Sequence, residues 1–275
     1  TNAFTFRGGR ITLAKQSESL DIVWSRPLPD DANPLNLTIS LDTSGRCFVS
    51  VLVETDVQPL EKTKAEVGID VGIKTLATTS EGEKIENPRP LVKHEKRLRI
   101  LQRRLSRKVK DSNNRKKARF RVARLHAKIS DTRRDRLQKF TTKIIRENQA
   151  IYVEGLNVVG MTKNHNLAKH KVDAAFGEIF RELEYKAAWY GRTYFPLDKF
   201  FPSSKLCSSC GQVLDELPLS VREWDCPACG AHHDRDINAA KNIKRAGQYL
   251  LKWKKTTGSD ARKVTPTRNE RRRSA

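Results

Sequence analysis

The sequence predicts an α/β protein, because three features divide its 275 residues into parts of different character. Short apolar runs bounded by turn residues occupy the first part of the chain, and such runs are typical of β-strands. Residues 92–149 are highly charged with narrow apolar stripes, which predicts a basic helical hairpin. Four cysteines near the C-terminus are spaced as in small metal-binding knuckles.

The first strands are expected in a β-rich segment, residues 1–60. Residues 35–41 alternate apolar and polar side chains, and residues 47–53 are mostly apolar. The residues between them, Asp42-Thr43-Ser44-Gly45, favour a turn. The sequence therefore predicts an antiparallel hairpin here. Cys47, which begins the second apolar run, is expected to be a buried core residue.

Further elements follow in order along the chain. Residues 65–70 and 73–79 predict a second hairpin, and residues 150–156 and 194–201 predict two more strands. A helix is expected over residues 173–190, with Asp173 as its N-cap and a core-facing stripe of Phe176, Ile179, Phe180, Leu183 and Ala187. A last helix is expected over residues 238–246, and the basic tail from Lys252 onward is expected to be disordered.

Positive charge is concentrated in the expected helical hairpin. The whole chain has a formal net charge of +22, and residues 91–150 hold 22 Lys and Arg against five Asp and Glu, a net charge of +17. Like charges on a helix repel unless a partner neutralises them, so nucleic-acid contact is favoured over a merely solvated hairpin. No apolar stretch approaches the length of a membrane span. The candidate contacts are Arg103, Arg104, Arg107, Lys108, Lys110, Arg115, Lys116 and Lys117.

The four-cysteine pattern joins Cys207-x2-Cys210 to Cys226-x2-Cys229 across fifteen residues. Two residues between cysteines let a tight turn aim both sulfurs at one point, and two such turns make the tetrahedral site that Zn2+ favours. Since four thiolates leave no open position, one structural zinc ion is expected. The alternatives are disulfides or free thiols, or His232 or His233 in place of a cysteine. The polar N-terminus shows no signal peptide, so we expect a reducing, cytosolic compartment.

Three carboxylates stand in unusual surroundings. Asp70 and Glu154 lie within apolar strand-like runs, and Asp236 precedes the last helix. Burying a lone carboxylate costs several kcal/mol unless it is paired or binds a metal. Each has a plain alternative: Asp70 as a turn residue, Glu154 as a surface residue, Asp236 as a helix cap. Together they predict a site for two divalent cations, Mg2+ or Mn2+, that cleaves phosphodiesters. Asp234 competes with Asp236 for the third position.

Four stretches of the chain, in order, resemble motifs of the TnpB family, which insertion sequences encode and which is similar to type V CRISPR nucleases. They are Gly68-Ile69-Asp70-Val71-Gly72-Ile73-Lys74; Glu154-Gly155-Leu156-Asn157 with Gly160-Met161; Phe201-Pro202-Ser203-Ser204-Lys205-Leu206-Cys207; and His233-Asp234-Arg235-Asp236-Ile237-Asn238-Ala239-Ala240-Lys241-Asn242-Ile243. The resemblance implies an RNase H-like (RuvC) core and RNA-guided DNA cleavage for a mobile element, in the prokaryotic cytosol. It assigns the catalytic metal to Asp70, Glu154 and Asp236, and it implies guide RNA and target DNA as partners.

The sequence departs from the family in two places. We find neither the first wedge strand nor the helical recognition region, so we expect an N-terminally shortened member. Gly155 stands where an acidic residue is common. Two rival functions remain, a non-catalytic nucleic-acid-binding protein and a DNA strand-transferase.

The expected domain organisation has five parts. They are a β-rich wedge-like segment, 1–60; the RuvC-like core, 61–206, with the hairpin 92–149 inserted; the zinc ribbon, 207–230; the third motif with its helix, 231–250; and the basic tail, 251–275.

Overall fold

The structure is a computed structural model that describes residues 3–29, 32–156 and 175–257. Its contacts divide the chain into two compact units, Thr1–Val57 with Lys96–Lys128, and Gln58–Glu95 with Ile129–Ala275. Each unit contains its own β-structure, and two helices, α1 and α2, have residues in both. The molecule is thus a mixed α/β protein, as the sequence predicts.

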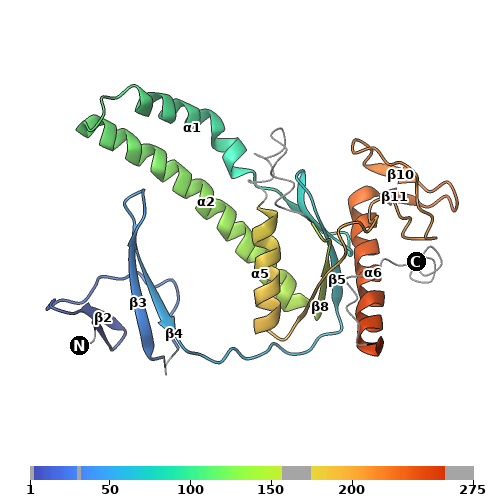
Figure 1. Cartoon of the computed structure of the whole chain (residues 1–275), viewed down its shortest axis with the longest axis horizontal. Coiled ribbons are helices and arrows are strands. Elements are labelled where there is room, and N and C mark those ends of the chain that lie inside the picture. The colour runs from blue at the N-terminus through green and yellow to red at the C-terminus, as the bar shows by residue number, and fades with distance from the viewer. Residues whose placement is uncertain (1–2, 30–31, 157–174, 258–275) are drawn as a thin grey trace. The chain divides into compact units, whose positions relative to one another are not determined.

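The first unit contains two antiparallel β-hairpins. Strand β1 (Phe4–Arg7) pairs with β2 (Arg10–Leu13), and β3 (Pro34–Leu41) pairs with β4 (Cys47–Val53) (Figure 1). The predicted turn at residues 42–45 joins β3 to β4: an Oδ1 atom of Asp42 accepts hydrogen bonds from the amide and the hydroxyl of Ser44. The hairpin expected over residues 35–53 is therefore confirmed.

The expectation that Cys47 is buried is wrong. Cys47 is exposed, and it pairs with Leu41, whose side chain is 70% exposed. Both residues adjoin the turn, at the end of a two-stranded sheet where few other side chains can cover them. An apolar run in sequence marks a strand, but it does not by itself show which of its residues are covered.

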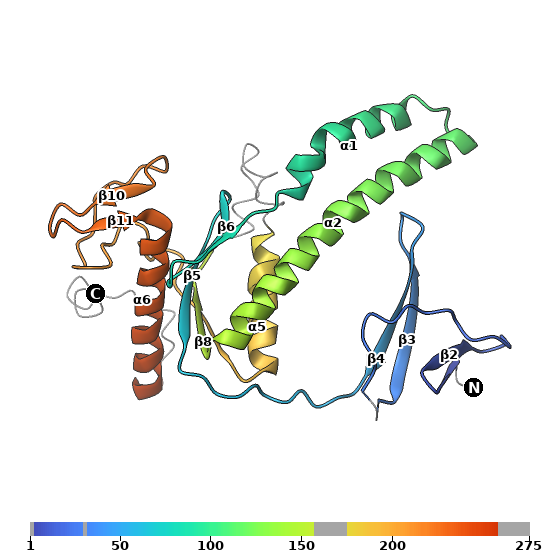
Figure 2. The same ribbon diagram turned by 180° about the vertical axis from the view of Figure 1, so that it is seen from behind.

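Two helices follow the second unit's first three strands. Helix α1 (Pro90–Ser106) and helix α2 (Asn113–Glu147) occupy the segment where the sequence predicts a helical hairpin, and they lie side by side in both views (Figures 1 and 2). Asp111 adopts a left-handed conformation with φ 62° in the connection between them. Val109 comes after the end of α1 and is 77% exposed.

The second unit is built on a five-stranded mixed sheet. Its order is β7 (Lys84–Glu86), β6 (Thr75–Thr79), β5 (Glu66–Val71), β8 (Ala150–Val153) and β9 (Thr193–Pro196). Strands β5, β6 and β7 form an antiparallel meander, whereas β8 and β9 run parallel to β5. The carboxyl ends of β5, β8 and β9 therefore meet at one edge of the sheet.

Helices cover both faces of this sheet (Figures 1 and 2). Ile151 and Val153 of β8 pack on the C-terminal half of α2 and on α5 (Phe176–Trp189). The alternate residues, Ala150 and Tyr152, pack on α6 (Arg235–Thr257). Because successive side chains of a strand point to opposite faces, this alternation assigns one face of β8 to each helical layer.

Helix α6 approaches the sheet more closely than ordinary side chains would allow. A Cβ atom placed on Gly68 of β5 would overlap the carbonyl oxygen of Ala240, and one on Gly247 of α6 would overlap the ring of Tyr152. Both glycines are therefore needed for the contact between sheet and helix. The helix also extends further than the sequence predicts: it starts at Arg235 and continues to Thr257, so residues 252–257 are helical, not disordered.

Some sequence-based expectations fall outside the described residues. They concern Asn157, Gly160 and Met161 of the second motif, Asp173 as a helix cap, and the tail beyond residue 257. Within the part of the chain that the structure describes, no helix combines the length and the apolar character that a membrane crossing needs.

Candidate functional site

Two of the predicted carboxylates lie on neighbouring strands at the carboxyl edge of the sheet. Strands β5 and β8 pair in parallel with Ile69 opposite Val153, so Asp70 and Glu154 follow at the same level. The amide of Val71 donates a hydrogen bond to Oε1 of Glu154 at 3.3 Å. This bond ties the Glu154 side chain to the strand that carries Asp70.

The third carboxylate comes from the helix that covers the same face. Gly68 and Tyr152 both contact α6, and Asp70 and Glu154 lie two residues further along their strands. The two-residue period therefore directs both carboxylates toward the α6 side. Asp236 lies in the first turn of α6. All three arise from different elements, and all three are partly buried.

The electrostatics of these groups reflects their crowding. Burial, followed by the negative charges of Glu154 and Asp236, holds the pKa of Asp70 well above its usual range, while Arg235 acts in the opposite direction. Burial raises the pKa of Glu154 to about 7, although the Val71 amide lowers it. A divalent cation nearby would offset this repulsion and stabilise the charged form of Asp70.

The neighbouring Asp234 has a different role. Its Oδ1 atom accepts hydrogen bonds from the amides of Asp236 at 3.1 Å and Ile237 at 3.0 Å, so Asp234 caps helix α6. Its Oδ2 atom forms an ion pair with Lys84 of β7. Asp236 instead has Arg222 as a distant partner, at 3.7 Å between Nη1 and Oδ1. The cap orients the turn from which Asp236 projects.

The structure brings the four predicted cysteines together. Their sulfur atoms all lie within 4.8 Å of one another, with 3.8 Å between Cys207 and Cys229 and 3.6 Å between Cys210 and Cys226. Four sulfurs bound to one zinc ion at about 2.3 Å would be separated by about 3.8 Å. The thiols thus fit a tetrahedral structural metal such as zinc.

Two matching turns present these sulfurs. The amide of Gly211 donates to the carbonyl of Cys207 at 2.9 Å, and the amide of Gly230 donates to the carbonyl of Cys226 at 2.8 Å. Both glycines have left-handed backbones, with φ of 78° and 71°. Glycine adopts this conformation without steric cost, which explains why one follows each cysteine pair. A short ladder of β10 (Glu223–Asp225) and β11 (His232–Asp234) supports the second turn.

The adjacent histidines are placed differently. His233 is buried, its Nε2 atom lies 3.0 Å from the sulfur of Cys207, and its ring packs on Trp224. Burial lowers the pKa of His233, which favours the neutral ring. His232 is exposed and contacts Asp225 at 2.8 Å. His233 therefore lies beside one cysteine as a hydrogen-bonding neighbour, while the cysteines alone form the described group with ligand spacing.

Sequence reasoning missed the residues that fasten this cluster to helix α6. Asn238 donates to the carbonyl of Leu206 at 2.8 Å and accepts from the amide of Ser208 at 2.9 Å. Asn242, one turn further along, donates to the carbonyls of Ser203 and Leu206. The available signal was two asparagines four residues apart on one face of the last helix, because amides on a covered face need partners. The cysteine cluster and Asp236 are thus held by the same helix.

The parts of the basic helices α1 and α2 that lie in the first unit form a separate feature. Seven of the eight predicted contact residues are exposed, and a cavity of about 450 Å3 lies between the end of α1 and the start of α2. Arg115 is only partly exposed, since its guanidinium donates to the carbonyls of Leu105 and Lys108 and so closes the end of α1. The cavity is lined by five cations and no acid: Arg104, Arg107, Lys108, Lys117 and Arg121, with Leu101, Asn114 and Ala118.

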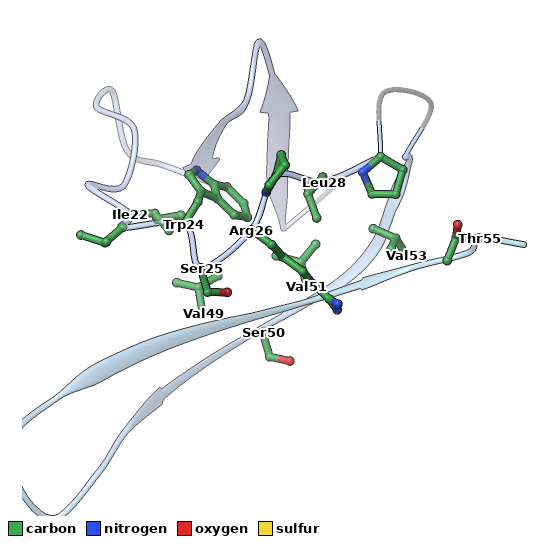
Figure 3. Close-up of a pocket in the computed structure, with 13 residues that line it drawn as sticks. Ile22, Trp24, Ser25, Arg26, Leu28, Val49, Ser50, Val51, Val53 and Thr55 are labelled. Carbon is green, nitrogen blue, oxygen red and sulfur yellow. The ribbon is translucent and has the colours of Figure 1, made fainter. Parts of the chain in front are cut away.

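A larger cavity, of about 740 Å3, also lies in the first unit, between residues 22–29 and strand β4. Figure 3 shows Trp24 and Leu28 on one side of it and Val51 and Val53 on the other. Its lining includes one cation, Arg26, and no carboxylate. It therefore lacks the groups that metal-dependent chemistry needs, which the sheet edge of the second unit provides.

Comparison with known proteins shows which families the chain is similar to. Residues 48–165 match the OrfB_IS605 family, described as "Probable transposase", and residues 176–243 match the Cas12f1-like TNB domain. A Streptomyces pristinaespiralis protein named "Putative RNA-guided DNA endonuclease" is 54% identical over 90% of this chain and 61% of its own length. The chain is therefore similar to the TnpB family. The two matched regions contain Asp70, Glu154 and Asp236.

More distant TnpB relatives are similar over shorter stretches. The Escherichia coli protein named "Putative RNA-guided DNA endonuclease InsQ" is 34% identical over 78% of this chain and 57% of its own length. A mimivirus "TnpB-like protein L79" is 23% identical over 83% of this chain. The chain thus spans about three-fifths of the length of the first two relatives. A solved Cas12f1 complex with sgRNA and target DNA has a TM-score of 0.49 and 17% identity, covering 76% of this chain and 55% of that one.

Proposed function

We propose that the chain is an RNA-guided DNA endonuclease of a mobile element, with an RNase H-like core that hydrolyses phosphodiesters using two metal ions. One observation carries the proposal: Asp70, Glu154 and Asp236 come from three elements and interact on one face of the sheet. The names of the relatives support RNA-guided DNA cleavage as the activity. Guide RNA and target DNA are the proposed partners, and the prokaryotic cytosol the proposed location.

The chemistry follows from the carboxylate set. Oxygen ligands of this kind suit Mg2+ or Mn2+, and the three carboxylates would hold the ions at the sheet edge. Bound there, the cations would activate water and stabilise the leaving oxygen of the phosphodiester. The chain's own part is to fix the ligands. The Val71 amide orients Glu154, and the Asp234 cap orients the turn that carries Asp236.

We further propose that Cys207, Cys210, Cys226 and Cys229 hold one structural Zn2+ in a zinc ribbon. The sulfur spacing and the paired glycine turns support this assignment. Burial works to raise the pKa of Cys226, but hydrogen bonds with the amides of Ala228 and Cys229 and with the thiols of Cys207 and Cys210 together lower the pKa to about 7. A thiol with a lowered pKa readily provides the thiolate that zinc binds. Through Asn238 and Asn242 the metal would stabilise the start of α6.

The remaining parts take the roles that the sequence indicates. Residues 1–60 would be part of a wedge-like segment, 61–206 the nuclease core, 92–149 an inserted basic hairpin, 207–230 the zinc ribbon, and 231–250 the third motif. The hairpin would bind the nucleic-acid backbone, because its cavity collects five cations without an acid.

A direct cleavage assay tests the proposed activity. The chain, purified with the RNA that accompanies it in its host, is expected to cut a target plasmid in Mg2+ or Mn2+ and to leave it intact in EDTA. Mapping the product ends separates hydrolysis from strand transfer, since transfer would join the cut end to another strand. Binding without cutting in either metal would favour a non-catalytic nucleic-acid-binding protein.

A second experiment tests the hairpin. The triple variant Arg104→Gln, Arg107→Gln, Lys117→Gln is expected to weaken binding to nucleic acids of any sequence. It should also reduce the slope of log K against log[salt] by about 2, since each lost phosphate contact contributes about 0.7–0.9. The measurement is fluorescence anisotropy over a series of salt concentrations.

The matched control for this experiment removes the same charge outside the cavity. Arg103, Lys110 and Lys116 are exposed, and none of them lines it. Their replacement by glutamine is expected to change the slope less than the cavity variant does. Equal slopes for the parent and the cavity variant would mean that these cations are merely solvated.

A further inference from the structure

The loop that follows strand β9 lies directly beside the proposed metal site. Strand β9 ends at Pro196 opposite Val153, and the amide of Leu197 donates to the carbonyl of Val153 at 2.9 Å. A Cβ atom on Gly155 would overlap the carbonyl oxygen of Leu197 and crowd the amide of Lys199. The backbone of residues 197–199 therefore contacts the residue next to Glu154, and only glycine permits that approach.

The loop holds its two aromatic residues in opposite environments. Phe201 packs on the buried cluster that includes Tyr152 and Phe195, whereas the side chain of Phe200 is 76% exposed. Asp198 stabilises the turn between β9 and the two phenylalanines. Its Oδ1 atom accepts a hydrogen bond from the Phe200 amide at 2.8 Å, and its carbonyl accepts one from the Phe201 amide at 3.1 Å. The hydrogen-bonded turn and the packing of Phe201 therefore hold Phe200 in an exposed position.

A cation accompanies the exposed ring. The Nζ atom of Lys199 lies 4.7 Å from the centroid of the Phe200 ring. An exposed aromatic side chain with an adjacent cation is the combination by which proteins bind unpaired nucleotides, because the ring stacks on a base and the cation attracts the phosphate. Phe200 lies one residue after the backbone that contacts Gly155, and its exposed ring is available to a partner outside the chain.

We propose that Phe200 stacks on an unpaired base and Lys199 contacts the adjoining phosphate, so that the loop positions a single strand at Asp70, Glu154 and Asp236. This inference rests on the proposed nuclease function and adds two residues, Phe200 and Lys199, that position the strand. The location supports it, because ligands of α/β sheets bind outside the carboxyl ends of parallel strands, which is where this loop lies.

The test measures binding, so that it does not depend on cleavage. The full chain is titrated with a single-stranded oligodeoxynucleotide in EDTA, at a salt concentration that screens the basic helices. Phe200→Ala is expected to weaken binding about tenfold, and Phe200→Trp to restore it. The same oligonucleotide without its bases should bind the parent and Phe200→Ala equally, because stacking is then absent. Lys199→Gln should weaken binding to both oligonucleotides.

A matched control and two outcomes decide the inference. Trp189 is 54% exposed on α5, outside the loop, and Trp189→Ala should bind as the parent does. The inference is wrong if Phe200→Ala binds the intact oligonucleotide as tightly as the parent does. It is also wrong if Phe200→Ala loses as much affinity for the base-free oligonucleotide as for the intact one. It is also overturned if Phe200→Ala alters only self-association, since the loop would then be a protein contact. If the parent shows this base-dependent binding but does not cleave in Mg2+, base stacking by Phe200 is supported while the nuclease function is refuted.

Discussion

Replacing Asp70, Glu154 or Asp236 by the matching amide is expected to reduce DNA cleavage by at least about a hundredfold, since in the proposed site each carboxylate helps to hold the cations. Nucleic-acid binding should be unchanged or slightly tighter, because the change removes a negative charge beside the phosphate path. The measurements are the initial rate of plasmid cleavage in Mg2+ and the Kd of the same DNA in EDTA. The variants Asp70→Asn, Glu154→Gln and Asp236→Asn keep the size of each side chain.

Asp234→Asn is the matched control for this series. Asparagine retains the oxygen that caps α6, and only the partly exposed ion pair with Lys84 is lost, which contributes about 0–1 kcal/mol. Most of the activity should therefore remain. If Asp234→Asn were inactive while Asp236→Asn remained active, the third ligand would be Asp234. If all four variants matched a parent that cuts nothing, the non-catalytic function would replace the nuclease.

The parent is expected to purify with the single zinc ion proposed above, and Cys226→Ser is expected to purify without it. Loss of the metal should lower the stability of residues 207–234 by several kcal/mol, because binding energy in such sites is folding energy. Zinc is measured by atomic emission on freshly purified protein, and the loosening by hydrogen exchange at residues 223–240. The protection of amides at the start of α6 should fall as well, since Asn238 bonds to both flanks of Cys207.

The control for the zinc experiment is the one cysteine outside the cluster. Cys47 is exposed and lies in the first unit, so Cys47→Ser should retain both zinc and amide protection. A parent without stoichiometric zinc would refute the assignment, as would a Cys226→Ser variant that keeps it. Loss of zinc without any change in exchange at α6 would show that the helix stands independently of the metal.

The sequence predicted those parts of the second unit that depend on local pattern. Asp70 and Glu154 could be singled out because a carboxylate within an apolar run is costly, and cysteine spacing alone indicated the cluster. The neighbourhood of each group could not be predicted in this way. Nothing in the pattern showed that Glu154 receives the Val71 amide, or that Gly155 is required by the carbonyl of Leu197. Such contacts depend on which strands become neighbours.

The sequence-based predictions are wrong where the same local pattern is compatible with two structures. Both Asp234 and Asp236 could cap the last helix, and a start at Asn238 was predicted; the structure places the cap at Asp234 and the start at Arg235. Cys47 was expected in a core because its run is apolar, yet its place beside a turn leaves it exposed. Asn238 and Asn242 were overlooked, because their partners lie more than thirty residues earlier in the chain.

The way Asn238 and Asn242 bind the cysteine knuckle has a consequence for protein engineering. Their side-chain amides form hydrogen bonds that the backbone of residues 203–208 would otherwise lack. The cysteine cluster and the start of α6 should therefore be transferred together when they are grafted. A graft of residues 203–234 onto another scaffold would leave bare carbonyls at Ser203 and Leu206, each costing about 1–3 kcal/mol. A graft that also carries residues 235–250 would bring their partners with it, and Asp236 in its native orientation.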